Sequence, residues 1–188
     1  MDHADEKKIP RCKPALAAFA LLAAMVVGTS APAQAQQAEI RIGFVNPSTG
    51  AFGALGKAAR KGMDLAIANA AANPKLKDIR FVVEERDSAA KSPDAIRYAR
   101  ELIQRENVDV LMGGLSSAEC LSLQKLAPEV KIAYLPTSGC WADEFANAEN
   151  VNKYAFRVTA SNKQRNFAFA DWLVKNSGKN WYVIYSDF

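Results

Sequence analysis

The chain has 188 residues, and its 24 lysines and arginines against 20 aspartates and glutamates give a formal net charge of +4. These charges are spread along the sequence, which argues against a nucleic-acid-binding protein. The one histidine is His3, so the rest of the chain lacks the histidine that Ser-His-Asp sites, Cys-His sites and many metal sites need. We therefore expect no enzyme activity, no metal and no cofactor.

The first 35 residues are typical of a secretory signal peptide. Basic residues up to Lys13 precede an apolar run from Ala15 to Val27, and Ala-x-Ala cleavage sequences lie between Ala31 and Ala35. The alternative is a membrane anchor, but a membrane-spanning helix needs about 20 apolar residues. We expect residues 1–35 to be cleaved and the mature protein to be located in the periplasm.

Beyond this segment, strand-like and helix-like patterns alternate. Short apolar runs bounded by turn residues predict strands at Ile40–Val45, Ile79–Val83, Val108–Met112, Ile132–Leu135, Tyr154–Val158 and Trp181–Tyr185. Helical periodicity predicts helices over Leu55–Ala72, from Ser92 as N-cap, from Ser116 or Ser117, and over Ser161–Asn176. This alternation predicts an α/β fold with a parallel sheet flanked by helices, in which ligands bind at the carboxyl ends of the strands.

The turn Gly113–Ser117 joins an expected strand to the start of an expected helix. Unpaired amide groups and the positive end of the helix dipole attract an anion at such a position. The hydroxyls of Ser116 and Ser117 can also hydrogen-bond a carboxylate. The alternative is that these serines only cap the helix. A second polar turn, Thr137–Gly139, ends the next strand at the same edge, and the two turns together favour a binding site.

The glycine-rich segment Gly50–Ala58 does not fit a phosphate-binding loop. Ala51 stands where that motif has its first glycine, and Ala58 stands where it has a magnesium-binding hydroxyl. We expect a flexible turn in which the backbone approaches a ligand closely.

Other residues near these turns have both a functional and a structural interpretation. Trp141 either stacks on a ligand or packs beneath its own loop, and the large area of an indole favours packing. The carboxylates of Glu84, Glu85 and Asp87 follow an expected strand, and we expect them to form a solvated face and not an acid/base set.

Two cysteines remain once Cys12 has been removed with the signal peptide. They are Cys120 and Cys140. An even pair in an oxidising compartment can form a disulfide. The alternative is two separate buried thiols, and the sequence does not decide between them.

Six segments, in this order, resemble the leucine/isoleucine/valine-type periplasmic binding proteins of branched-chain amino acid ABC transport. They are IRIGFVNPSTGAFGALGKAARKGMDLAI, ERDSAAKSPDAIRYARELI, VDVLMGGLSSAECLSLQKLA, IAYLPTSG, YAFRVTASNKQRNFAFADWLV and WYVIYSDF. The resemblance implies the type I periplasmic binding fold, with a small-molecule ligand held between two lobes and an ABC transporter membrane permease as the partner. It further implies an incomplete first lobe over residues 36–153 and the beginning of a second lobe over residues 154–188.

The resemblance also implies which residues hold the ligand. The first lobe would contact the carboxylate of an amino acid or a similar ligand through Ser116, Ser117, Thr137, Ser138 and Gly139. Leu55 occupies a ligand-contacting position that is often aromatic in amino-acid-binding members, and Gly139 occupies one where a threonine hydroxyl is usual. These two differences weaken the case for a branched-chain amino acid and leave another small carboxylate, such as an aromatic acid, as the alternative.

In this family the polypeptide continues past the segment that resembles WYVIYSDF, so the resemblance implies a truncated protein. The alternatives to an ABC importer component are the ligand-sensing domain of a receptor with the same fold, a non-functional truncated fragment, and an exported α/β enzyme. The lack of histidine after the signal peptide disfavours the enzyme.

Overall fold

The computed structural model describes residues 37–188 except for residues 138, 178–179, 183 and 185–188. The predicted signal peptide, residues 1–35, lies outside the described residues. Within the described ranges, no helix combines the length and the apolar character needed to cross a bilayer.

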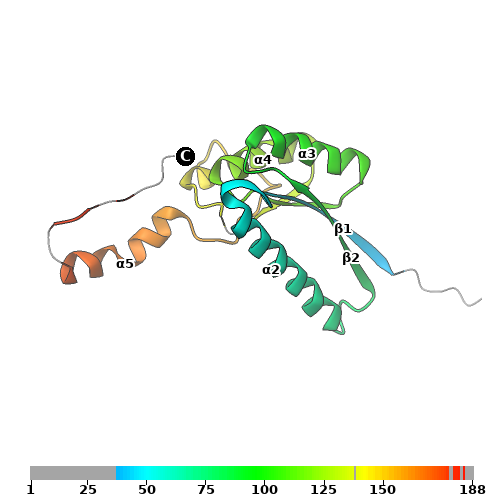
Figure 1. The fold of residues 1–188 in the computed structure, drawn as a ribbon, viewed down its shortest axis with the longest axis horizontal. Helices are drawn as coiled ribbons and strands as arrows, with labels where there is room; N and C mark the ends of the chain where they lie inside the picture. Colours follow the sequence, from blue (N-terminus) through cyan, green and yellow to red (C-terminus); the bar gives the residue numbers. More distant parts are fainter. Residues whose placement is uncertain (1–36, 138, 178–179, 183, 185–188) are drawn as a thin grey trace, which may run out of the picture. The chain divides into compact units, whose positions relative to one another are not determined.

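The described chain forms a parallel four-stranded sheet in the order β2-β1-β3-β4, which confirms the predicted α/β fold (Figure 1). The strands are β1 (Ala38–Asn46), β2 (Ile79–Asp87), β3 (Val110–Gly113) and β4 (Ala133–Pro136). The chain leaves β1 toward one edge of the sheet and later returns to β1's other side. The carboxyl ends of β1 and β3 therefore flank a topological switch point, where sheets of this kind bind ligands.

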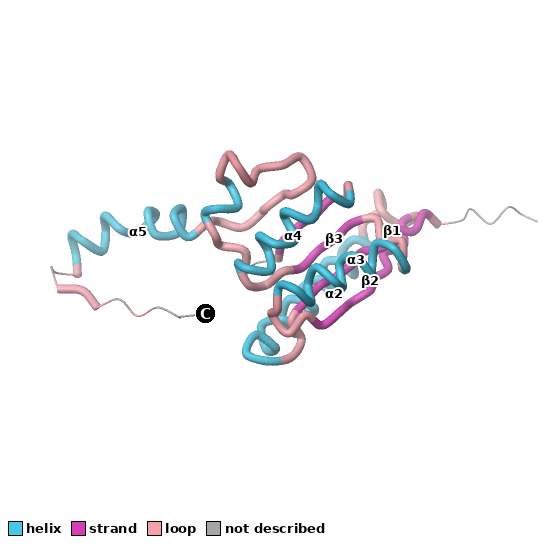
Figure 2. Tube along the Cα trace, turned by 90° about the horizontal axis from the view of Figure 1, so that it is seen from above, coloured by secondary structure: helices cyan, strands magenta, loops and turns pink. Residues whose placement is uncertain are grey.

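Helices cover the two faces of this sheet unequally. The helical segments are η1 (Gly50–Phe52), α2 (Gly53–Ala72), α3 (Ser92–Arg105), α4 (Ser117–Val130), η2 (Asp143–Ala146) and α5 (Asn162–Asn176). The reversal at the switch point places α2 on one face and α3 with α4 on the other, as right-handed crossovers require (Figure 1). Figure 2 shows helix and strand alternating along the trace, as the sequence predicts.

The main hydrophobic core lies between the sheet and the pair α3 and α4. Leu102 of α3 and Leu123 of α4 are fully buried there, together with Leu111 and Tyr134 from the sheet. Burying a leucine side chain stabilises the fold by about 1.5–3 kcal/mol. In β3 and β4 every second residue is buried, because only one face of these strands is fully covered.

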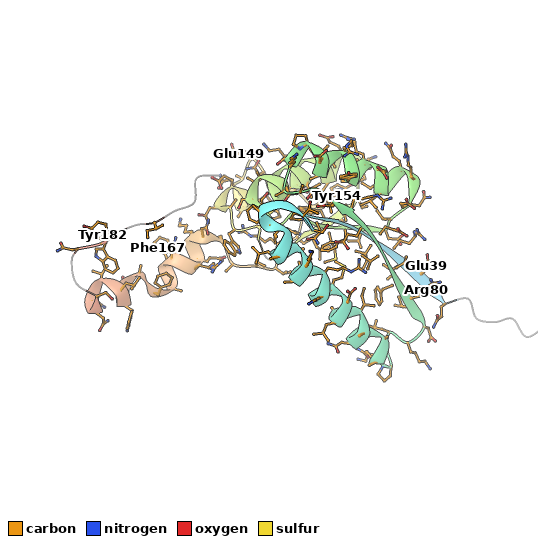
Figure 3. All side chains as sticks on the ribbon, viewed as in Figure 1. Glu39, Arg80, Glu149, Tyr154, Phe167 and Tyr182 are labelled. Atoms are coloured by element: carbon orange, nitrogen blue, oxygen red, sulfur yellow. A yellow bond between two sulfur atoms is a disulfide. The ribbon has the colours of Figure 1, made fainter. Side chains whose placement is uncertain are left out.

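Charged side chains form ion pairs between β1 and β2, toward the amino ends of these strands. Glu39 and Arg80 lie near the amino ends of β1 and β2 (Figure 3), with 3.6 Å between the carboxylate and the guanidinium. The Arg41 guanidinium also contacts Glu39, at 2.9 Å, and reaches Glu84 at 3.0 Å. These pairs help to set the register of β1 on β2, away from the switch-point edge.

Two local predictions differ from the structure. Helix α3 begins at Ser92 itself, so the N-cap is Lys91, which makes no side-chain capping hydrogen bond. The predicted strand Tyr154–Val158 is reduced to one bridge between Tyr134 and Ala155. The bridge does not extend because β4 is short and ends at Pro136, which has no amide to donate to a neighbouring strand.

The last described segment packs little of its apolar surface. Helix α5 buries none of its residues, and Phe167 and Trp172 are 69% and 63% exposed. Phe167 and Tyr182 are marked in Figure 3. Trp181 and Tyr182 show no strand where one was predicted, and residues 183 and 185 of that prediction lie outside the described residues. The predicted lobe boundary at residues 153 and 154 stays a prediction.

Candidate ligand-binding site

The start of α4 is built by two glycines and a capping box. Gly113 and Gly114 have φ of 124° and 70°, which lets the chain turn sharply from β3 into the helix. The Ser116 hydroxyl accepts a hydrogen bond from the Glu119 amide (3.2 Å), and the Glu119 carboxylate accepts one from the Ser116 amide (3.2 Å). The predicted capping of α4 is therefore confirmed, with Ser116 as the N-cap.

Capping leaves the next amides of α4 without an acceptor. The capping box satisfies the Ser116 and Glu119 amides, and the Cys120 amide bonds to the Ser116 carbonyl. Among the described residues, no hydrogen bond is found for the Ser117 and Ala118 amides. The amino end of a 14-residue helix thus presents two amide donors and its positive dipole end.

The buried groups beneath this helix start are fixed. The Tyr134 hydroxyl donates a hydrogen bond to the Gly113 carbonyl (3.1 Å). Burial, together with the nearby Glu119 carboxylate, raises the pKa of Tyr134 well above its ordinary value, so the phenol stays protonated and remains a donor. The Tyr134 side chain therefore supports the turn from β3 to α4 from below.

A cavity of about 690 Å³ opens in front of these amides at the switch-point edge. Its polar wall is the start of α4, from Leu115 to Ala118. Its apolar walls come from three other segments and consist of Phe52, Leu55, Ala58, Ala59, Ala90 and Trp141, with Gly139 and Asn162 completing the lining. None of the described residues that line this cavity has a charged side chain.

Four of the six predicted ligand-binding residues line this one cavity: Leu55, Ser116, Ser117 and Gly139. Ser138 lies outside the described residues. Thr137 lines a different groove, on the α2 face of the sheet, so the structure does not bring it to the cavity.

Gly139 forms its part of the wall with its backbone. A Cβ atom at this position would overlap the carbonyl oxygen of Leu115, so the turn after β4 is pressed against the segment that leads into α4. Glycine is the one residue that fits this close approach without displacing either segment.

A disulfide joins the same two segments. Cys120, in the first turn of α4, is bonded to Cys140, and both are fully buried. Their Cα atoms lie 5.7 Å apart, within the usual range for a disulfide. Of the two possibilities that the sequence left open, the structure therefore selects the bonded pair.

Trp141 is not packed beneath its loop, so that expectation was wrong. The side chain is 40% exposed and lines the cavity. The Arg165 guanidinium lies 4.2 Å from the indole ring centre, and the Asn162 amide donates to the Trp141 carbonyl (2.9 Å). The start of α5 thus fixes the tryptophan at the cavity wall, a tertiary contact that the local sequence does not reveal.

The expected solvated face of Glu84, Glu85 and Asp87 was also wrong, because all three carboxylates are half-buried and paired. Glu85 accepts hydrogen bonds from the buried Asn46 side chain (2.9 Å) and from Arg60 of α2 (2.7 Å). This chain of contacts fastens α2 to the carboxyl ends of β1 and β2, and so positions the wall of the cavity that α2 supplies.

Asp87 fastens two loops beside the cavity. Its carboxylate accepts hydrogen bonds from the Thr49 hydroxyl (2.6 Å) and from the Ser48 and Ala89 amides (both 2.9 Å). Burial acts to raise the pKa of Asp87, but these hydrogen bonds outweigh it and hold the pKa below its ordinary value. The segments that carry Phe52 and Ala90 are thereby joined at their bases.

The glycine-rich segment does not expose its backbone to the cavity in the expected way. Gly53 and Gly56 of α2 are buried, and a Cβ atom at Gly56 would overlap the Pro47 carbonyl oxygen. The close approach that requires glycine is between α2 and the end of β1. The cavity is instead lined by Phe52 and Leu55, each of which directly precedes one of these glycines.

A second groove lies between α2 and the sheet, with a volume of about 520 Å³. Its lining is almost entirely apolar, including Met63, Phe81 and Met112. The Thr137 hydroxyl is buried there, with no hydrogen-bond partner among the described residues. Because this groove offers no group of amide donors at a helix start, the cavity in front of α4 is the better candidate for anion binding.

Comparison with known proteins agrees with this geometry. Residues 39–188 match the family described as "Periplasmic binding protein". The chain belongs to this family. The predicted resemblance is therefore confirmed, and with it the type I periplasmic binding fold.

Relatives in this family are longer than the chain. Leu/Ile/Val-binding protein homolog 7 of Brucella abortus is 28% identical over 134 residues, which are 71% of this chain and 33% of that protein. The chain thus spans about a third of the length of the curated relatives it matches.

Solved structures show the same periplasmic binding fold. A solute-binding protein of an ABC transporter from R. palustris in complex with benzoate is 27% identical, with a TM-score of 0.64 over 74% of this chain and 38% of that one. LivJ of Streptococcus pneumoniae, in complex with isoleucine, is 23% identical, with a TM-score of 0.55 over 65% of this chain and 34% of that one. This chain therefore aligns with little more than a third of each of these solved chains.

Sequence reasoning missed several cavity residues of this periplasmic binding lobe. Phe52, Ala90 and Asn162 line the cavity although their local patterns predict only a turn, a loop and a helix start. The aromatic surface that the family resemblance suggested at Leu55 is supplied by Phe52 and Trp141. The available signal was topological, since all these residues follow the carboxyl end of a strand or begin a helix at the same edge.

Proposed function

We propose that this chain supplies the carboxylate-anchoring lobe of the periplasmic substrate-binding component of an ABC importer, which captures a small organic carboxylate and delivers it to a membrane permease. The observation that carries the proposal is the cavity at the switch point, where the free amides of Ser117 and Ala118 face apolar walls. The secretory pattern of residues 1–35 supports a periplasmic location. We further propose that residues 36–153 form this lobe and that residues 154–188 begin the second.

The capture step follows from the start of α4. A carboxylate oxygen accepts hydrogen bonds from the Ser117 and Ala118 amides, with the Ser117 hydroxyl as a third donor. Hydrogen bonds to a charged group contribute about 1.5–3 kcal/mol each, and the helix dipole adds to the attraction. The Ser116 hydroxyl caps α4 and does not contact the carboxylate, because it is already bonded to Glu119. Closure of a second lobe over the bound ligand completes the site by a hinge motion.

The walls favour an aromatic carboxylate over a branched-chain amino acid. Phe52 and Trp141 offer ring surfaces, and within the described ranges the cavity lining includes no carboxylate that could receive a ligand ammonium group. Benzoate is bound by the R. palustris relative and isoleucine by LivJ, so both ligand classes occur among the structural neighbours. We expect benzoate or a hydroxybenzoate to bind this chain more tightly than isoleucine.

Titration calorimetry of the full chain with benzoate, 4-hydroxybenzoate, isoleucine and leucine tests the proposal. We expect benzoate to bind and its uncharged methyl ester to bind at least tenfold more weakly, because the ester loses the charge that α4 attracts. Ser117→Ala should weaken benzoate binding at least tenfold, since one hydrogen bond to a charged group contributes about 1.5–3 kcal/mol. Ser122→Ala removes a hydroxyl one turn further along α4 and is the matched control. Equal binding of the ester and the acid would overturn the anchoring role of α4.

A further inference from the structure

The disulfide joins two walls of the cavity. One is the start of α4, and the other is the turn that follows β4. Cys120 follows Ser117 and Ala118 on α4, while Cys140 is flanked by Gly139 and Trp141. All four of these neighbours line the cavity. Each cysteine is therefore within three residues of a residue that lines the cavity.

Few other contacts hold these walls together. Before the turn, the Thr137 amide donates to the Gly113 carbonyl (3.1 Å). In the described chain, the hydrogen bonds found for residues 139–141 are formed within the turn or with residues 159–162. None of them is formed with α4. Among the described residues, the turn is joined to the start of α4 by the backbone contact of Gly139 with Leu115 and by the disulfide.

We propose that Cys120 and Cys140 are positioning residues of the ligand site. Their bond fixes the distance between the free amides at the start of α4 and the wall formed by Gly139 and Trp141. Because binding strength depends on amides and wall being in place before the ligand arrives, loss of the bond weakens ligand binding beyond its effect on folding. This inference rests on the proposed function.

A purely structural disulfide is the alternative, since any cross-link stabilises a fold by restricting the unfolded chain. The matched control is Leu126→Ala, which removes a buried side chain from the same helix more than two turns from the cavity. All proteins carry Cys12→Ala, so that no third thiol can exchange with the pair. Benzoate titrations compare this background with the Cys120→Ala/Cys140→Ala protein and with Leu126→Ala, at a temperature where all three are folded.

We expect benzoate affinity to fall at least tenfold in the double cysteine variant and to stay within twofold in Leu126→Ala. Equal affinity losses in the two proteins, or unchanged affinity in the cysteine variant, would overturn the positioning role. If the double variant does not fold, dithiothreitol reduces the bond in the folded Cys12→Ala chain. One dithiol then supplies the two electrons and two protons that convert the disulfide to two thiols.

Amide hydrogen exchange provides a readout that needs no ligand. The Glu119 amide is bonded within the capping box, and the Trp141 amide is bonded to Gly139. Without the disulfide, we expect exchange at these two amides to accelerate at least tenfold more than at Leu102 in the core. A uniform acceleration would overturn the inference. If the Cys12→Ala chain fails to bind any carboxylate, the proposed function fails, and the exchange pattern still decides the role of the disulfide.

Discussion

The two faces of the sheet differ in how completely their helices are packed. On the α3 and α4 face, Leu102, Leu111, Leu123 and Tyr134 are fully buried. On the other face, α2 buries only Gly53 and Gly56. Helix α5, near the end of the described chain, buries no residue. The buried core is thus concentrated on one side, and the candidate site lies at the edge of that better-packed half. A substitution of the same kind should have different consequences on the two sides.

The largest difference is expected from truncating core side chains. Leu102→Ala should lower the free energy of unfolding by about 2–5 kcal/mol, because it removes a buried side chain and leaves a cavity. Leu65→Ala on the exposed side of α2 should change it by less than about 0.5 kcal/mol. Urea unfolding followed by circular dichroism measures both values. Similar losses in the two variants would show that the α2 face is packed as tightly as the core.

A smaller difference is expected from two matching caps. Ser116 and Ser161 form the same capping box at the starts of α4 and α5. Ser116→Ala should lower the free energy of unfolding by about 1–2 kcal/mol, because it removes an N-cap and a partner of the buried Glu119. Ser161→Ala should fray α5 locally and leave global unfolding nearly unchanged. Comparable global losses would contradict the difference in packing between α4 and α5.

The smallest effect concerns Asp87, whose pKa the hydrogen bonds from Thr49, Ser48 and Ala89 hold below its ordinary value. Since the unfolded chain binds this proton more readily, Asp87 stabilises the fold fully above its unfolded pKa of about 3.9. That contribution is lost as the pH falls through the lower folded pKa. Asp87→Asn should therefore reduce the change in melting temperature between pH 5 and pH 3. An unaltered pH dependence of the melting temperature would show that the Asp87 carboxylate does not stabilise these loops.

The sequence predicts the fold better than it predicts the site. Strand and helix alternation is a local pattern, so the parallel sheet and the capped start of α4 were predictable from residues such as Ser116. The pairing of Glu85 with Arg60 and the placement of Trp141 under Arg165 depend on tertiary contacts. They become visible only once the strand order brings distant loops to one edge.

The sequence also overpredicts one strand. Tyr154–Val158 has a strand-like composition, yet only Ala155 pairs with the sheet. Composition indicates that a segment can form a strand, whereas the length of the pairing is set by the neighbour, here the four-residue β4 that ends at Pro136.

The strand order leaves β2 and β4 as the outer strands, and each is guarded against adding a strand from another molecule by a different means. The bridge from Ala155 and the missing amide of Pro136 block continuous pairing along β4. Along β2, Arg80, Glu84 and Arg86 place charges on the outer strand, which disfavour docking of an apolar strand. Neutralising the charges on β2 should therefore promote edge-to-edge aggregation, while the β4 side stays protected by its backbone.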